Sequence, residues 1–144
     1  LMDAENGCAI ISYNAFHSPK LRYEAVISGA QDFIGLDSSG EELLSLIRRV
    51  VKRDYIVEPK ELTKLANEFG FPKGSNQLEL KLSELSDANT EAIKLFLTGQ
   101  NDQSIAKQLD LARTRVSQLI DSLIESAGLT SRNQLHLALS AGIK

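Results

Sequence analysis

The sequence predicts an α/β module followed by an all-α domain of four helices. Two short apolar runs, over 8–13 and 33–36, are each followed by a helical pattern, and successive strand–helix units are typical of parallel strands in an open sheet. In the last part of the chain every apolar pattern has helical spacing and glycines stand where helices end. We therefore expect a partial α/β module over 1–58, a linker over 59–82 and a helical domain over 83–144.

The first strand–helix unit ends at Gly29. The apolar run over 8–13 is rich in β-forming residues and predicts a buried strand. Pro19 suits the first turn of a helix over 20–28, and Gly29 follows where a helix C-terminus prefers glycine.

The second unit has a strand over 33–36 and a helix capped by Ser38 or Ser39. One apolar stripe runs along that helix, formed by Leu43, Leu46, Ile47 and Val50. Because two strands make a poor sheet, either the chain supplies strands elsewhere or it is a fragment of a larger α/β domain. We favour the fragment.

The linker over 59–82 begins with a short helical pattern over 61–69, which Gly70, Pro72 and Gly74 then break. Beyond it, Leu78, Leu80 and Leu82 alternate with charged residues. This period of two predicts an edge strand or an extended segment.

The four helices of the last part have clear boundaries. Ser86, Asn101 and Ser131 stand where N-caps are expected, and the third helix, over 113–127, follows Ala112. A turn of about three to four residues separates the second helix from the third, which is the spacing of a helix-turn-helix. In the last helix, Leu135, Ala138 and Leu139 are expected to point inward.

Composition excludes several classes of protein. The net charge of −3 argues against a protein that coats nucleic acid, although a local basic patch can still bind DNA. A single cysteine and the lack of an apolar run of about 20 residues favour a cytoplasmic protein. Cys8, His17 and His136 have no metal-ligand spacing, and no phosphate loop or nucleophile motif occurs. We expect no enzyme, no metal and no cofactor.

The helical domain resembles the LuxR-type (NarL/FixJ) helix-turn-helix. The residues that carry the resemblance are Leu85-Ser86, Glu91-Ala92-Ile93, the stretch from Gly99 to Leu109, Val116, the stretch from Ile124 to Leu135, and Ala141-Gly142. They are in register over about sixty residues without an insertion. The resemblance implies a transcription regulator whose third helix enters the major groove of double-stranded DNA. It also implies a homodimer, with RNA polymerase as a further partner.

Carried over residue by residue, the resemblance implies a set of DNA contacts. The groove-facing candidates are Arg113, Thr114, Arg115, Ser117, Gln118 and Asp121, and the phosphate-binding candidates are Asn101 and Gln103. Arginine can bind guanine edges or phosphates, and glutamine can pair with adenine. However, Ser117 stands where the family usually has lysine, and 83–144 holds six basic against seven acidic residues. These departures leave a second interpretation open, a protein-interaction module that uses the fold without DNA.

Two regions are candidates for dimerisation. In the family the last helix pairs two subunits, so Leu137 and Ala141, expected on its outer surface, are candidates for that contact. Arg48, Arg49 and Lys52 form a basic run on the second predicted helix. That run is a solvated helix face, half of a charged dimer contact, or a phosphate contact.

The first part resembles the last two strand–helix units of a response-regulator receiver domain. The carrying residues are Ala9-Ile10-Ile11, Ala25, Gly29-Ala30, Phe33, Asp37 and Glu41-Glu42-Leu43. A working receiver has Thr or Ser and a Lys on these strands, and the corresponding positions lie near Asn14 and Leu36. Leu36 cannot pair with a phosphoryl charge, so we expect a phosphorylation-independent module. Asp3 lacks the helix that would follow a phosphoacceptor strand, so the phosphoacceptor stays unknown.

Overall fold

The computed structural model describes residues 10–14, 18–35, 37–52, 55–71 and 76–141. The elements are β1 (Ile11–Asn14), α1 (Pro19–Ile27), β2 (Asp32–Gly35), α2 (Gly40–Val50), α3 (Pro59–Phe69), α4 (Asn76–Ser83), α5 (Asp87–Leu97), α6 (Asp102–Leu109), α7 (Arg113–Ser126) and α8 (Arg132–Ser140). The predictions for Asp3, Cys8, His17 and Leu36 lie outside the described residues.

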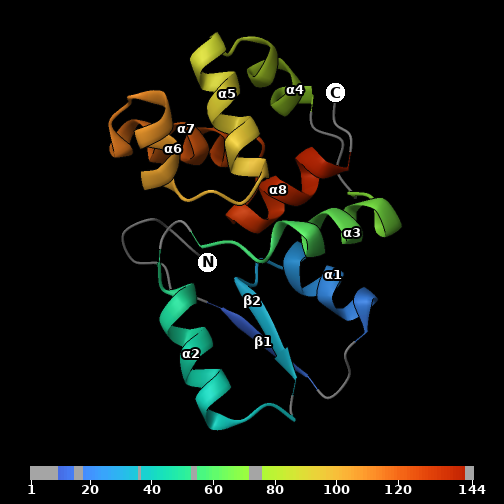
Figure 1. Cartoon of the computed structure of the whole chain (residues 1–144). Helices are drawn as coiled ribbons and strands as arrows, with labels where there is room; N and C mark the ends of the chain where they lie inside the picture. Colours follow the sequence, from blue (N-terminus) through green and yellow to red (C-terminus); the bar gives the residue numbers. More distant parts are fainter. Residues whose placement is uncertain (1–9, 15–17, 36, 53–54, 72–75, 142–144) are drawn as a thin grey trace.

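The α/β part contains a parallel pair of strands, as predicted. In β1 and β2, Ile11 lies opposite Asp32 and Asn14 opposite Gly35. Helix α1 connects the two strands, and α1 and α2 flank the sheet (Figure 1). Pro19 occupies the first turn of α1, and Gly29 adopts φ +98° just beyond its end, a conformation that glycine reaches without steric cost.

Side-chain caps fix the starts of four helices. Ser39, Ser86, Asn101 and Ser131 each accept a hydrogen bond from the backbone N–H three residues further on. Ser38 and Ser39 were both predicted as possible caps of α2, and the residue that caps it is Ser39. Helix α7 starts after Ala112, which cannot cap it through a side chain.

The prediction of an edge strand or extended segment around Leu78, Leu80 and Leu82 is wrong, because these residues lie in helix α4. Leu78 is fully buried and Leu82 packs against the same core, whereas Leu80 is 60% exposed. Residues four apart share one face of a helix, while a strand would place all three leucines on one face. A half-buried strand would bury all three leucines, whereas here Leu80 is exposed, as expected for a helix.

Two apolar clusters hold the chain together. The first lies inside the bundle of α4 to α8 and includes Phe96, Ile105 and Ile120. The second joins the two parts of the chain and consists of Val26, Val57, Leu62, Leu65, Ala66 and Leu137. Helix α3 supplies three members of this second cluster, which we call the junction core, so the predicted linker takes part in folding.

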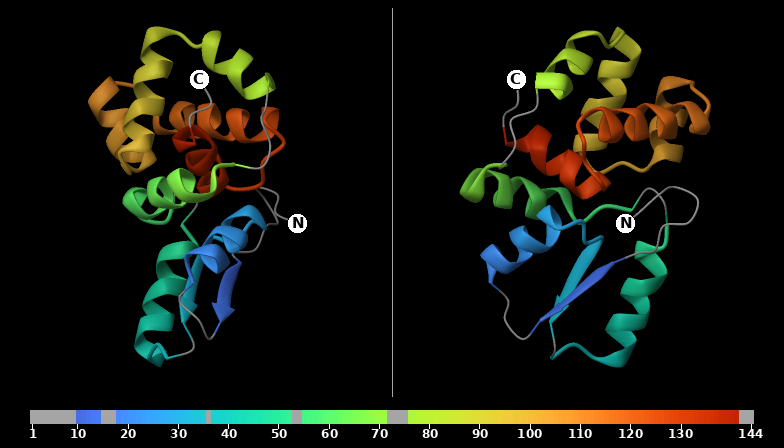
Figure 2. Two further views of the ribbon diagram at one scale, coloured as in Figure 1. Left: turned by 90° about the vertical axis from the view of Figure 1, so that its right-hand side faces the viewer. Right: turned by 180° about the vertical axis from the view of Figure 1, so that it is seen from behind.

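Helix α8 lies between the bundle and the α/β part (Figures 1 and 2). It packs against α3 and α1 on one side and against α5 and α7 on the other. Within the described residues, no helix is long and apolar enough to cross a membrane.

Candidate nucleic-acid interface

Helices α6 and α7 follow each other after a short turn, which is the order and spacing that the sequence predicts. The turn between them spans residues 110–112, and Asp110 adopts the left-handed conformation with φ 54°. The backbone N–H of Leu111 then bonds to Ala106 O at 2.9 Å, which closes the end of α6. This short, tightly bonded turn fixes the direction in which α7 leaves α6.

Helix α7 has one apolar face and one solvent-exposed polar face. Val116, Ile120 and Leu123 are at most 2% exposed and pack into the bundle. At about 100° per residue, the opposite face carries Thr114, Arg115, Gln118, Ser122 and Glu125, all of which are exposed. Arg113, in the first turn, is exposed as well. Sequence reasoning missed Ser122, although its place one turn beyond Gln118 is a usable signal.

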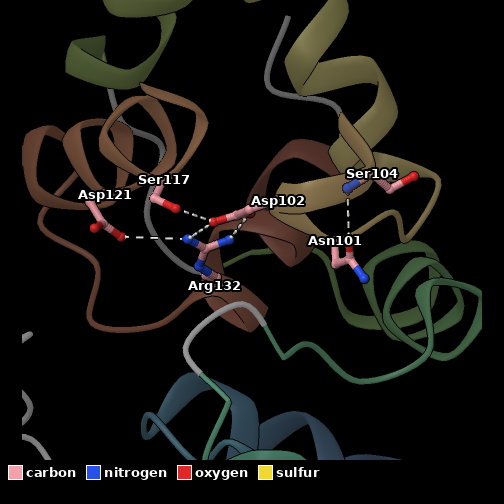
Figure 3. Close-up of polar contacts among 6 residues, drawn as sticks. All are labelled: Asn101, Asp102, Ser104, Ser117, Asp121 and Arg132. Atoms are coloured by element: carbon pink, nitrogen blue, oxygen red, sulfur yellow. Dashed lines mark hydrogen bonds and ion pairs between the residues drawn. The ribbon is translucent and has the colours of Figure 1, made fainter. Parts of the chain in front are cut away.

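Ser117 and Asp121 lie apart from this exposed face. The Ser117 hydroxyl donates to Asp102 Oδ2 at 2.5 Å, and Asp121 Oδ1 lies 3.8 Å from Arg132 Nη2 (Figure 3). Both side chains are half-buried. Of the six predicted groove-facing residues, these two contact groups within the bundle, and the charge of a third, Arg113, acts on Asp102.

The partner of Ser117 is a buried carboxylate. Asp102, the first residue of α6, accepts two hydrogen bonds from Arg132, the first residue of α8, at 2.7 and 2.9 Å. Their side chains are 2% and 5% exposed. Burial opposes ionisation of Asp102, but hydrogen bonds from Arg132 and Ser117 prevail, and the pKa of this carboxyl lies below its ordinary value. The pair is thus a doubly bonded ion pair inside the domain.

The predicted phosphate contacts lie at the start of α6. Asn101 and Gln103 are both exposed. The Asn101 Oδ1 accepts from the Ser104 N–H at 2.8 Å, and its amide nitrogen points away from the helix end (Figure 3). Asn101 therefore caps the helix with its oxygen and can donate a hydrogen bond with its nitrogen.

Helix α8 differs from the prediction. Leu137 is fully buried in the junction core and Ala141 packs against the same cluster, so the prediction that these residues lie on an open outer surface is wrong. Helices α1 and α3 cover this side of α8, and no local pattern in the sequence indicates that packing. Arg48, Arg49 and Lys52, the other dimer candidates, are exposed on and just beyond α2.

Two amide side chains of α8 bind the backbone of the α/β part. Asn133 Oδ1 accepts from the Val57 N–H at 2.8 Å, and its Nδ2 donates to Gln31 O at 2.7 Å. Gln134 Nε2 donates to Ile27 O at 2.8 Å and Val26 O at 3.1 Å. These contacts bind carbonyls at the end of α1 and before β2, and so join α8 to the backbone of the α/β part.

Across the ranges that the structure describes, no group of three His, Cys, Asp or Glu side chains could hold a metal ion. His136 is buried, and its Nε2 donates to Leu97 O at 3.0 Å. Its role is thus a hydrogen bond between α8 and the end of α5.

Comparison with known proteins found relatives among bacterial regulatory proteins, while no family model matches the chain. The chain is 26% identical over 128 residues to the transcriptional regulatory protein DesR of Bacillus subtilis. It is 24% identical over 128 residues to the oxygen regulatory protein NreC of Staphylococcus carnosus, and 28% identical over 130 residues to NreC of Staphylococcus aureus. These alignments cover 88–89% of this chain and 58–59% of the relatives, so the chain spans about three-fifths of their length.

A search of solved structures matched full-length FixJ from B. japonicum. The match has a TM-score of 0.38 and 18% sequence identity, and it covers 94% of this chain and 62% of that one.

Proposed function

Because the chain is related to response regulators of the LuxR/NarL/FixJ type, we propose that it is a transcription regulator that reads the major groove of DNA with α7. The observation that carries this proposal is the polar outer face of α7, where Arg115 and Gln118 are exposed opposite the buried apolar stripe. In this proposal residues 83–144 form the DNA-binding domain, 1–58 a receiver-like module and 59–82 their connection.

The distribution of charge around α7 supports the proposal. Arg113 and Arg115 put two positive charges in the first turn, where the helix dipole also favours an anion. Asp102 and Asp121 both face Arg132, whose single charge offsets one of the two carboxylates. Outside this cluster 83–144 holds five basic and five acidic residues, and Arg113 and Arg115 place two of the positive charges at the start of α7.

Mutation of the two arginines tests the proposal directly. The probe is a duplex selected from a randomised pool by the wild-type chain, titrated at several salt concentrations. Arg113→Ala and Arg115→Ala are each expected to weaken binding by on the order of 1–3 kcal/mol and to lower the salt dependence. Lys94→Ala, an exposed change on α5, is the matched control. Binding that survives the double arginine substitution unchanged would contradict the assignment.

A protein-interaction module without DNA is the second candidate. Glu125 on the exposed face of α7 and the inward-facing Ser117 favour it, since neither attracts phosphate. The same titration distinguishes the two candidates. If the wild-type chain shows no salt-dependent binding even at low salt, the interaction module is the better description.

For assembly we propose a homodimer in the cytoplasm that also contacts RNA polymerase. Two copies would place their α7 helices about one DNA turn, ~34 Å, apart on a near-palindromic site. Leu137 is covered by α3, so pairing through Leu137 requires the junction core to open. Arg48, Arg49 and Lys52 are exposed without such a change.

We also propose that activity does not depend on phosphorylation, because Leu36 stands where a receiver has lysine. Acetyl phosphate is then expected to leave DNA affinity and sedimentation unchanged. A shift in sedimentation on adding beryllofluoride would contradict this.

A further inference from the structure

A single buried carboxylate connects three helices of the DNA-binding domain. We propose that Asp102, together with Arg132 and Ser117, sets the rotation of α7 about its own axis and so determines which α7 side chains face the DNA. This inference rests on the proposed function. It makes Asp102, Arg132 and Ser117 positioning residues, none of which contacts a base.

The three side chains come from separate helices and meet at one point (Figure 3). Asp102 and Arg132 are the first residues of α6 and α8, and their two parallel hydrogen bonds fix both the distance and the angle between the helix ends. Ser117, in the second turn of α7, donates to the same Asp102 at 2.5 Å. Helix α7 is thereby tied to a pair that is already rigid.

The rotation of α7 decides the readout because neighbouring residues point about 100° apart. Ser117 directly precedes Gln118, so the inward hydrogen bond of Ser117 turns Gln118 to the exposed face. The apolar stripe alone defines the rotation of α7 about its axis less exactly, because apolar contacts have no directional preference. A hydrogen bond weakens steeply when its angle changes and is therefore the more exact constraint.

Two further side chains lie on the same side of α7 as Ser117. Arg113 and Asp121 lie four residues before and after Ser117, and residues four apart share a helix face. Asp121 lies 3.8 Å from Arg132, and the charge of Arg113 contributes to the low pKa of Asp102. One side of α7 thus faces the Asp102–Arg132 pair over two turns.

Stability alone does not explain such a pair. Replacing a buried ion pair with apolar residues is often neutral or stabilising, whereas fixing one arrangement among several is its best-attested role. The smaller partner, Ser117, gives the cleaner test, because Ser117→Ala leaves the two hydrogen bonds between Arg132 and Asp102 in place.

The experiment is a double-mutant cycle in the full chain with Ser117→Ala, Asp102→Asn and the double variant. The probes are the duplex selected by the wild-type chain and a scrambled duplex. We expect Ser117→Ala to weaken binding to the selected duplex about tenfold, the effect of one mismatched base pair, while scrambled-duplex affinity and salt dependence stay unchanged. Ser117→Thr, which keeps the hydroxyl, should restore binding.

Coupling separates a positioning residue from a DNA contact. If Ser117 acts through Asp102, the double variant binds the selected duplex as well as whichever single variant binds it more weakly. Ser122→Ala, on the exposed face of α7, should instead combine additively with Asp102→Asn. If Asp102→Asn does not fold, the pair Asp102→Asn with Arg132→Gln, which removes both charges together, takes its place in the cycle.

Three results would overturn the inference: an unchanged affinity in Ser117→Ala, additive effects of Ser117→Ala and Asp102→Asn, or an equal loss on both duplexes with a lower salt dependence. If selection from the randomised pool yields no duplex that the wild-type chain binds, the proposed function fails, and residual dipolar couplings of α7 in the free chain decide the positioning. A changed α7 orientation in Ser117→Ala supports it, and an unchanged orientation contradicts it.

Discussion

Helices α7 and α8 pack against each other and both are rich in polar residues, yet these residues lie in opposite environments. On α7 the polar face is open, with Arg115, Gln118 and Ser122 exposed. From the cap of α8 onward, eight consecutive residues, Ser131–Ala138, are buried, and five of them are polar: Ser131, Arg132, Asn133, Gln134 and His136. Across the described residues, every buried side-chain N or O atom has a hydrogen-bond partner. The polar groups of α8 are thus used within the chain, whereas the exposed ones of α7 face the solvent.

The largest expected difference between the two helices concerns their arginines. Arg132→Ala leaves the Asp102 carboxylate buried without its partner, and we expect a loss of about 3–5 kcal/mol in unfolding free energy. Arg115→Ala, on the exposed face of α7, should change it by less than about 0.5 kcal/mol. Urea unfolding of the two variants measures the difference. Equal losses would show that the Asp102–Arg132 pair adds nothing beyond a surface arginine.

The next effect concerns the apolar side of α8. Leu137 is fully buried in the junction core, so Leu137→Ala is expected to cost about 2–5 kcal/mol through lost burial and the cavity left behind. Leu80→Ala on α4, where the leucine is 60% exposed, is the matched control and should cost little. Urea midpoints compared at constant slope provide the measurement. A loss in Leu137→Ala no larger than in the control would mean that the junction core is open in solution.

The same contrast explains which features could be predicted from the sequence. The caps Ser86, Asn101 and Ser131 were predicted correctly because a cap and its N–H lie three residues apart. The paired strands and the helix-turn-helix follow from equally local patterns. Prediction failed for the partners of α8, because Asn133 binds Gln31 from 102 residues away. No local pattern distinguishes a buried asparagine from an exposed one.

The Asp102–Arg132 pair was missed for a related reason. Its members are 30 residues apart, and in the sequence they count only as one acidic and one basic residue. The inward hydrogen bond of Ser117 could not be predicted either, because the family resemblance aligns its position but not the direction of its side chain. Directions on a helix depend on the core it packs against, and the core is known only from the structure.

A moderate effect is expected from the amide that joins α8 to the α/β part. Asn133→Ala removes the bonds to Val57 N and Gln31 O, including the buried bond to Val57 N, at a cost of about 1–3 kcal/mol. Gln118→Ala on the exposed face of α7 is the matched control and should leave stability within about 0.5 kcal/mol. The protection of the Val57 N–H from hydrogen exchange measures whether its hydrogen bond to Asn133 is formed. If its protection is the same in Asn133→Ala and the wild type, the hydrogen bond does not form in solution.

The smallest effect depends on pH and concerns His136. Burial lowers the pKa of this imidazole below its ordinary value of 6.5, so below that pH the unfolded chain binds a proton that the folded chain excludes. Stability is therefore complete above pH 6.5 and falls as the pH is lowered toward the folded-state pKa, by at most about 1.4 kcal/mol per pH unit.

Urea unfolding of the wild type and His136→Gln between about pH 7 and pH 5 tests this dependence. Glutamine can still donate to Leu97 O but does not titrate, so the variant should lose this part of the pH dependence. Ser140→Ala is the matched control, because it removes the hydroxyl 3.2 Å from Nδ1 and keeps the imidazole. Since α7 contains no histidine, acid should weaken the packing of α8 before it alters the exposed face of α7. An identical pH dependence in His136→Gln and the wild type would mean that the imidazole is already accessible to protons in the folded chain.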